Sequence, residues 1–227
     1  MTWLAPLPEL QLRRHDVVHI HRDAWTSRVH DDFNPELFSI VDEWIALGRP
    51  FVARRPGACD GAGLPLGLPL PPSLGKARIA ITVAREAIAT IAPPPTLLEI
   101  QSFAPPAWQS TLDDVLALCA KFNIELRAFG SLAWQCLIGL DYLTPTSDVD
   151  LIFLNARRSV IAPLFGGLAE IEAKAPVRLD GEVVRADGAA TNWRELCTDP
   201  REVLVKTLDG VLLQSPTEFV EGLERCE

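Results

Sequence analysis

Asp148 and Asp150 are the residues of this sequence whose type and spacing most clearly predict chemistry. They alternate with apolar residues in the segment 147–154, a pattern that predicts a β-strand. Side chains two positions apart on a strand share a face and lie about 7 Å apart, so two carboxylates repel each other unless a cation lies between them. Mg²⁺ prefers oxygen ligands, and a pair of such ions polarises the attacking and leaving oxygens of a displacement at phosphorus. We therefore predict that Asp148 and Asp150 are catalytic and bind Mg²⁺ as a two-ion site.

Gly130 and Ser131 stand where a second predicted strand, 124–129, runs into a predicted helix, 132–140. A glycine at such a junction lets the backbone approach a ligand closely, and the exposed amides, the serine hydroxyl and the helix N-terminus can hold a phosphate. An Asp-x-Asp pair alone is more often a solvated strand edge. The ordered set of strand, Gly-Ser, helix, strand and Asp-x-Asp favours a site, and we predict that Gly130 and Ser131 bind substrate.

The predicted strand 177–184 carries two further acids, Asp180 and Glu182, on one face. Either acid could instead cap the turn at Gly181.

Prolines divide the sequence into two halves, with a dense group between Pro93 and Pro106. Because proline interrupts regular structure, we expect a smaller α+β N-terminal domain at 1–95, a Pro-rich linker at 96–107 and a catalytic domain at 108–227. The catalytic domain is predicted to hold a mixed sheet flanked by helices, so the fold class is α+β. In the N-terminal domain we expect strands at 17–20, 51–53 and 79–83, and helices at 35–47 and 85–91.

The composition narrows the class of substrate. The net charge is −9, from 30 acidic and 21 basic residues, which argues against a nucleic acid partner because such binding rests on neutralising phosphates. No apolar stretch is long and uncharged enough for a membrane span or a secretory signal, so we expect no membrane partner. The five cysteines are scattered without a Cys-x-x-Cys pair, which favours reduced thiols and a cytoplasmic location.

The arrangement of these motifs resembles the polymerase-β-like nucleotidyltransferase superfamily. The resemblance lies in Phe129-Gly130-Ser131, in Asp148-Val149-Asp150-Leu151 and in an acid on a later strand. It implies a nucleotidyltransferase-like sheet in the catalytic domain and a third metal ligand on a later strand, for which we choose Asp180 and keep Glu182 as the alternative.

A narrower resemblance covers nearly the whole chain. The sequence is similar to the malonate decarboxylase holo-acyl-carrier-protein synthase family, also called phosphoribosyl-dephospho-CoA transferase. The matching segments are 14–16, 48–52, 65–79, 130–151, 192–195 and 205–207. The most specific of them combines Gly-Ser-x-x-Trp-Gln with Ser-Asp-x-Asp, and the long spacing between these two motifs fits this family.

This resemblance implies a defined reaction. The donor would be 2′-(5-triphosphoribosyl)-3′-dephospho-CoA and the acceptor a serine of the apo acyl-carrier subunit of malonate decarboxylase, with pyrophosphate leaving. Two alternatives stay open: a nucleotidyltransferase that uses ATP on a small molecule or protein, and a non-catalytic module that binds the carrier or the coenzyme.

Within that frame, Asp148 and Asp150 hold the metals, and Gly130 with Ser131 holds the triphosphate. Lys76, Arg78 and Lys206 are the further candidates for substrate binding. Lys76 and Arg78 follow a Pro-rich turn and could meet phosphates of the CoA portion, or they could be solvated loop residues. Lys206 lies in an apolar stretch and could face a phosphate, or it could lie on a helix surface.

Docking of an acidic carrier protein on an acidic enzyme would need a local basic patch. The candidates are the pairs Arg54-Arg55 and Arg157-Arg158, of which we favour the second because it follows the active-site strand. The basic run 13–15 could contact the carrier or a phosphate, or it could be solvated surface. Trp134 is expected to be a core residue rather than a stacking platform.

Overall fold

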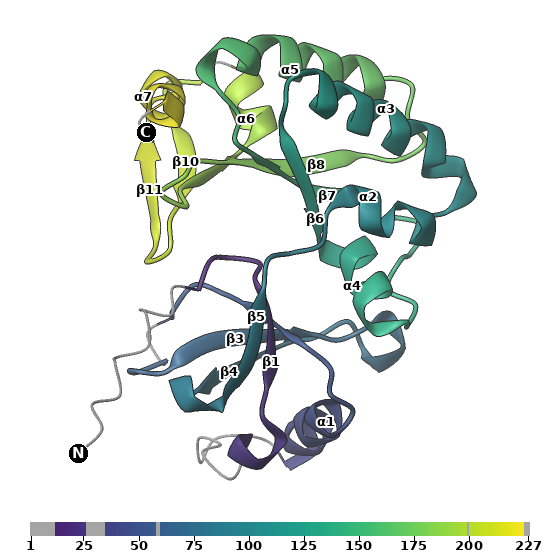
Figure 1. Cartoon of the computed structure of the whole chain (residues 1–227), viewed down its shortest axis with the longest axis vertical. Helices are drawn as coiled ribbons and strands as arrows, with labels where there is room; N and C mark the ends of the chain where they lie inside the picture. The colour runs from purple at the N-terminus through teal and green to yellow at the C-terminus, as the bar shows by residue number, and fades with distance from the viewer. Residues whose placement is uncertain (1–11, 26–34, 58–59, 199, 225–227) are drawn as a thin grey trace, which may run out of the picture.

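The computed structural model of the chain describes residues 12–25, 35–57, 60–198 and 200–224. Their backbone forms two β-sheets with helices, one sheet from each half of the sequence, and the two sheets lie one above the other in Figure 1. This mixed architecture confirms the predicted α+β class. Within the described residues, no helix is both long and apolar enough to cross a membrane.

The first sheet is antiparallel throughout, with the strand order β4-β3-β2-β1-β5. Its strands are β1 (Val17–Ile20), β2 (Phe51–Ala53), β3 (Leu64–Pro69), β4 (Arg78–Val83) and β5 (Ile88–Ala92). Helix α1 (Pro35–Ala46) packs Val41, Trp44 and Ile45 into the core of this sheet, where all three are buried. The indole Nε1 of Trp44 donates a hydrogen bond to the Pro50 carbonyl at 2.9 Å, so its polar atom is satisfied.

One expectation for this half was wrong, and one strand was missed. The range 85–91 was expected to be a helix, but only a short 3₁₀ turn at Arg85–Ala87 forms before β5 pairs with β1. The β-branched residues of β5 fit a pleated strand better than a helix, and pairing with β1 decides the outcome. Strand β3 was not predicted because of Pro65 and Pro69. Proline lacks an amide donor, but these two lie near the ends of the strand, where the hydrogen-bond ladder tolerates them.

The second sheet is mixed, with the order β11-β10-β9-β8-β7-β6. Its strands are β6 (Glu125–Phe129), β7 (Val149–Leu154), β8 (Leu179–Val184), β9 (Ala190–Asn192), β10 (Val203–Lys206) and β11 (Val211–Gln214). Only β7 and β8 pair in parallel, and helix α5 (Arg158–Glu172) provides the crossover between them. Helices α3 (Gln109–Lys121) and α5 lie side by side over one face of this sheet (Figure 1).

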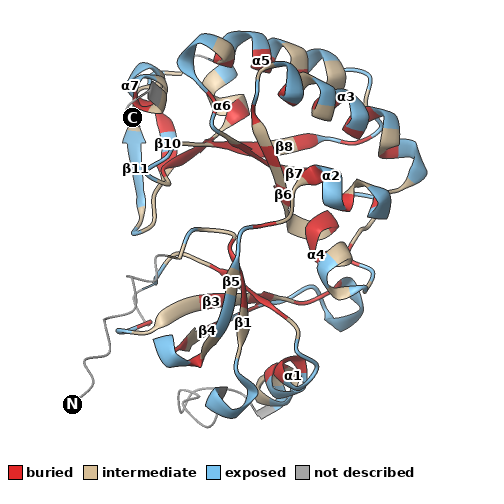
Figure 2. Cartoon of the chain, viewed as in Figure 1, coloured by how far each residue is buried: buried red, intermediate tan, exposed pale blue. Residues whose placement is uncertain are grey.

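Side-chain alternation gives the two faces of the second sheet different roles. Val149, Leu151 and Phe153 of β7 are fully buried in the core that α3 and α5 share (Figure 2). Asp150 alternates with them and therefore points to the opposite face, away from these helices. The apolar face fixes the register of β7, and this register places the acids on the open face.

Residues 96–107, which we expected to form a linker, contain a short helix and two 3₁₀ turns. Thr96 caps helix α2 (Leu97–Ile100) in a capping box with Glu99, and two 3₁₀ turns follow. Leu97 and Ile100 are fully buried in the core of the second sheet. The prolines before Thr96 mark the connection, whereas the residues after it belong to the C-terminal layer.

An apolar contact also joins the two halves. Helix α4 (Gly130–Ile138) follows β6, and its Trp134 is buried in the core of the first sheet, together with Tyr142 from the next loop. The Tyr142 hydroxyl donates a hydrogen bond to the Pro69 carbonyl on β3 at 2.9 Å. Trp134 is thus a core residue, as expected.

Candidate active site

Three aspartates meet on the open face of the second sheet. Asp150 on β7 is in register with Asp180 on β8, and Asp148 immediately precedes β7. One carboxylate oxygen from each of the three lies within 4.8 Å of those of the other two. The predicted trio Asp148, Asp150 and Asp180 is thus brought together, because a parallel strand pair aligns its acids at the same end of the sheet.

The charge of this cluster is not balanced by the protein. Burial raises the pKa of Asp150 to about 7, and the neighbouring charges of Asp148 and Asp180 add to the effect. Arg78 lowers that pKa, but by less than these contributions raise it. A cation between the three acids would offset the repulsion among their charges. Carboxylate oxygens are hard ligands, which suit Mg²⁺ or Mn²⁺.

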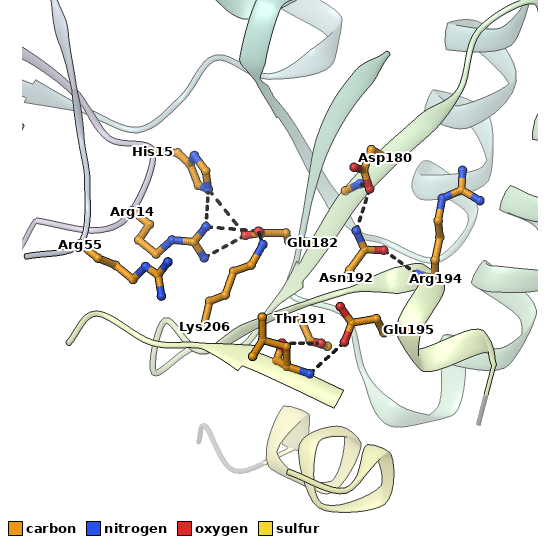
Figure 3. Close-up of polar contacts among 12 residues, drawn as sticks. Arg14, His15, Arg55, Asp180, Glu182, Thr191, Asn192, Arg194, Glu195 and Lys206 are labelled. Carbon is orange, nitrogen blue, oxygen red and sulfur yellow. Dashed lines mark hydrogen bonds and ion pairs between the residues drawn. The ribbon is translucent and has the colours of Figure 1, made fainter. Parts of the chain in front are cut away.

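Hydrogen bonds fix the orientation of Asp180. Its Oδ1 accepts from the Gly181 amide at 2.8 Å and from the Asn192 Nδ2 at 2.7 Å (Figure 3). Asn192 in turn caps helix α6 (Trp193–Cys197), where its Oδ1 accepts from the Arg194 amide at 2.9 Å. In the sequence, Asn192 stood out only as part of the segment 192–195, which is similar to the family named above. Its contact with Asp180 depends on the pairing of β9 with β8, which no local sequence pattern predicted.

Glu182, the alternative third acid, has different partners. Its carboxylate accepts from Arg14 Nη1 at 3.0 Å, from Arg14 Nη2 at 3.2 Å and from Lys206 Nζ at 2.5 Å, and His15 Nε2 lies 3.6 Å away (Figure 3). Burial alone would raise the pKa of Glu182, but His15, Arg14 and Lys206 together hold it well below its usual range. This carboxylate is buried, ionised and already neutralised by basic side chains. Asp180, and not Glu182, therefore belongs to the group of acids that could hold a metal ion.

Gly130, the first residue of helix α4, lies directly against the Asp150 carboxylate. Its φ is +66°, in the left-handed region that favours glycine, and an added Cβ would lie 1.8 Å from Asp150 Oδ2. Glycine suits this position for two reasons: it adopts the positive φ without strain, and it leaves room for the Asp150 carboxylate. Ser131, the next residue, lines the same cavity as Asp148 and Asp150.

A cavity of about 650 Å³ opens beside the aspartates, between the two halves of the chain. Its volume lies within the range of ligand pockets, about 300–1,000 Å³. One wall comes from the first sheet and includes Lys76 and Arg78, two of the candidates for substrate binding. The opposite wall includes Gly130, Ser131 and Asp150. The predicted Lys206 lies instead on β10, not on a helix, in contact with Glu182.

The basic pairs considered for docking have different environments. Arg54 makes a two-pronged ion pair with Asp60, whose pKa is lowered chiefly by the hydrogen bonds from Arg54. Arg55 Nη1 donates to the Gly210 carbonyl at 3.2 Å, which links the two halves. Arg157 and Arg158 are exposed at the start of α5, where Arg158 lies 3.7 Å from Glu221. Of the two pairs, Arg157 and Arg158 are thus more accessible to a protein partner.

The sequence profiles of one family match both halves of the chain. Residues 13–94 match the profile described as phosphoribosyl-dephospho-CoA transferase MdcG N-terminal domain, and residues 96–217 match the corresponding C-terminal domain. The boundary between the two matched ranges lies at the prolines that precede α2.

Relatives that carry this name align over most of their length. The chain is 39% identical over 211 residues to a phosphoribosyl-dephospho-CoA transferase of Bradyrhizobium diazoefficiens, covering 92% of each sequence. It is 37% identical over 214 residues to one of Xanthomonas campestris pv. campestris, covering 94% of this chain and 98% of the relative. No solved structure matches the chain with significance. The chain therefore belongs to the phosphoribosyl-dephospho-CoA transferase family and is an enzyme of the transferase class.

Proposed function

We propose that this enzyme transfers the phosphoribosyl-dephospho-CoA group from 2′-(5-triphosphoribosyl)-3′-dephospho-CoA to a serine of the apo acyl-carrier subunit of malonate decarboxylase. The serine Oγ forms a bond to the α-phosphorus, the bond from that phosphorus to the bridging oxygen breaks, and pyrophosphate leaves with the electron pair. The serine proton is released. The observation that carries the proposal is the trio Asp148, Asp150 and Asp180 beside the Gly130 junction, at a cavity sized for a coenzyme.

The three aspartates would hold Mg²⁺, as two ions in the reacting complex. When bound, such ions neutralise charge on the triphosphate and on the leaving pyrophosphate. The chain's own contribution is geometric. The Asn192 amide fixes Asp180, while the packed register of β7 and β8 fixes Asp150 opposite it.

Gly130 and Ser131 would hold the triphosphate. They open helix α4, whose first backbone amides have no partners within the helix and carry the positive end of its dipole. Because Gly130 has no Cβ, a phosphate oxygen and the Asp150 carboxylate can approach the same backbone segment.

The first sheet would bind the coenzyme portion of the donor. Lys76 and Arg78 line the cavity from the β4 side, where their charges can pair with the phosphates of dephospho-CoA. Apolar residues of β2, β3 and β4, including Val52, Leu68 and Ile79, line the same wall and suit the pantetheine chain. Lys206, which now neutralises Glu182, would add positive charge on the other side of the aspartates.

This division of work assigns a role to each predicted domain. The N-terminal domain would bind substrate, and the catalytic domain would hold the metals and the reacting groups. The carrier would dock on the exposed Arg157 and Arg158. We place the reaction in the cytoplasm, in keeping with the free thiols of Cys119, Cys136 and Cys197 among the described residues.

The test is a transfer assay read by intact mass. The purified chain, Mg²⁺ and the apo carrier subunit are incubated with triphosphoribosyl-dephospho-CoA or, in parallel, with ATP. We expect the carrier to gain the mass of phosphoribosyl-dephospho-CoA with the first donor only, and to lose this gain when its acceptor serine is replaced by alanine. An adduct with ATP alone would refute the proposed donor. Transfer at the wild-type rate by Asp148→Asn would refute the metal-dependent mechanism.

A further inference from the structure

The basic run near the N-terminus forms a tight turn that faces the active site. Asp16 N donates to the Arg13 carbonyl at 3.1 Å, and the Asp16 Oδ2 accepts from the Arg13 amide at 2.7 Å. Two backbone bonds join the turn to β2, from His15 N to the Ala53 carbonyl at 3.2 Å and from Ala53 N to the Asp16 carbonyl at 2.8 Å. The turn is therefore fixed to the first sheet.

His15 adopts an unfavourable backbone conformation in this turn. Its φ is +71°, at a turn position that usually holds glycine or asparagine. Strain of this kind persists only where the surroundings hold the residue, and it often marks a functional site. Here the imidazole ring lies 4.1 Å, centroid to centroid, from the ring of Phe129, which directly precedes Gly130. The strained turn is thus packed against the phosphate-binding junction.

This conformation directs Arg14 to the open face of the second sheet. Its guanidinium makes a two-pronged contact with Glu182, at 3.0 and 3.2 Å, and its Nη2 lies 3.2 Å from His15 Nε2. His15 Nε2 also lies 3.6 Å from the Glu182 carboxylate, so the tautomer of the ring sets which of these two neighbours it contacts as donor and which as acceptor. Burial lowers the pKa of His15 from its usual value, which favours the neutral ring. Arg14 is therefore held by two neighbours, and its side chain also lines the cavity with Asp148 and Asp150.

The cluster around Glu182 carries more positive than negative charge. Arg14 and Lys206 are cations, Glu182 is an anion, and His15 is neutral. Arg55 lies beside Arg14 and adds a further cation on this side (Figure 3). On a chain with a net charge of −9, a local positive excess beside an acidic metal site is suited to an anion that bridges the two.

We propose that Arg14 binds the triphosphate of the donor, and that Glu182 is the positioning residue that aims it. The N-terminal half would in this way complete the site that the catalytic sheet begins. The inference rests on the proposed function for the identity of the donor, and it adds a ligand from a turn that no motif of the catalytic half contains. A guanidinium suits this role because it keeps donors for a phosphate while it grips a carboxylate.

The test uses inorganic tripolyphosphate as the probe, titrated calorimetrically into the full chain at saturating Mg²⁺. We expect Arg14→Gln to weaken binding about tenfold, the scale of one charge-assisted hydrogen bond. Arg14→Lys should recover part of this loss. Arg201→Gln is the matched control, because Arg201 is exposed and, like Arg14, lies a few residues before a strand. Equal binding by Arg14→Gln and Arg201→Gln would overturn the proposal.

A double-mutant cycle tests the role of Glu182. If Glu182 acted only as a nearby negative charge, Glu182→Gln would strengthen tripolyphosphate binding. If it positions Arg14, the same change weakens binding about threefold to tenfold, and it has no further effect in the Arg14→Gln background. Circular dichroism and thermal melting confirm that each variant is folded. Strengthened binding, or additive losses in the double variant, would overturn the positioning role.

The two proposals fail in different ways. A wild-type chain that binds tripolyphosphate but transfers nothing from triphosphoribosyl-dephospho-CoA would contradict the proposed function alone. A wild-type chain that transfers the group while Arg14→Gln keeps full tripolyphosphate affinity and the wild-type KM for the donor would contradict only the present inference.

Discussion

Asp180 and Glu182 lie two residues apart on strand β8 and point to the same face, yet their surroundings are opposite. Asp180 belongs to a cluster of three aspartates that the basic side chains of the protein do not neutralise. Glu182 is gripped by Arg14 and Lys206 and needs no further cation. Strand β8 thus carries one acid of the candidate metal site and one acid whose charge is balanced by basic side chains of the protein. Neighbouring charge, rather than residue type, separates the two roles.

The two acids also differ in the source of the positive charge that can balance them. Around the aspartates the proposed mechanism would draw it from metal ions, whereas around Glu182 it comes from the other half of the chain and from β10. Substitutions on the two sides should therefore have different consequences: those at the aspartates remove activity, and those at Glu182 remove stability and alignment.

The largest expected effect is loss of transfer when a metal ligand is changed. Asp148→Asn or Asp150→Asn should lower the transfer rate by at least about 10³-fold, because charge stabilisation by the metals supplies much of the rate. The free energy of unfolding without metal should not fall, since a repelling charge is removed. Rates are measured by intact mass of the carrier, with Asp113→Asn, exposed on α3, as the control. Wild-type rates in both variants would contradict the assignment.

A smaller effect is expected from a single methyl group at the phosphate-binding junction. Gly130→Ala should lower the transfer rate about 10²-fold or more, because its Cβ would displace the Asp150 carboxylate. Gly139→Ala is a matched control at the other end of α4: Gly139 has a similar φ of +70°, but its added Cβ would meet nothing within 4 Å. Both variants should lose about 1 kcal/mol of stability from backbone strain. Equal transfer rates in the two would show that space beside Asp150 is unimportant.

The titration of Asp150 should appear in the pH dependence of stability of the metal-free protein. Its folded-state pKa is raised to about 7, so the folded protein binds a proton that the unfolded chain has already released. Stability from this group is present below about pH 4 and is lost as the pH rises to about 7, by a few kcal/mol in total. In urea unfolding with EDTA, Asp150→Asn should therefore gain stability over the wild type at pH 8 and little at pH 4. A constant difference between the two pH values would contradict the raised pKa.

Removing the structural acid should cost stability instead. Glu182→Gln leaves Arg14 and Lys206 without their anion, and we expect a loss of about 1–3 kcal/mol in the free energy of unfolding at pH 7. Both cations are partly exposed and can regain water, which limits the loss. Glu170→Gln, exposed on α5, serves as the control in the same urea titration. A loss of unfolding free energy no larger than that of Glu170→Gln would contradict a structural role for Glu182.

The smallest effect is expected at the docking surface. Arg157→Gln with Arg158→Gln should raise the KM for the carrier a few-fold and leave tripolyphosphate affinity unchanged, because exposed charges mainly steer association. The exposed contact of Arg158 with Glu221 contributes little stability, so the fold should not change. An unaltered KM at low salt would place the docking surface elsewhere.

Much of the catalytic half followed from local sequence patterns. Alternation predicted β7 and the shared face of Asp148 and Asp150, and the glycine at position 130 indicated the approach of α4 to the site. These signals are local, because strand period and turn chemistry depend on neighbouring residues.

Contacts between the halves could not be predicted in this way. Arg14 and Glu182 are separated by 168 positions in the sequence, and only the packing of the two sheets brings them together. The choice between Asp180 and Glu182 depended on these contacts, because strand parity places both acids on one face. The prediction of a helix at 85–91 was wrong for a similar reason, because the pairing of β5 with β1 outweighed the local pattern.

The central claim is that Asp180, and not Glu182, completes the metal site. It is tested most directly by titrating Mn²⁺ into the full chain and measuring bound ion by electron paramagnetic resonance, for the wild type, Asp180→Asn and Glu182→Gln. Our account predicts that Asp180→Asn weakens Mn²⁺ binding by at least about tenfold, and that Glu182→Gln binds Mn²⁺ like the wild type. Loss of binding in Glu182→Gln, with binding retained in Asp180→Asn, would contradict it.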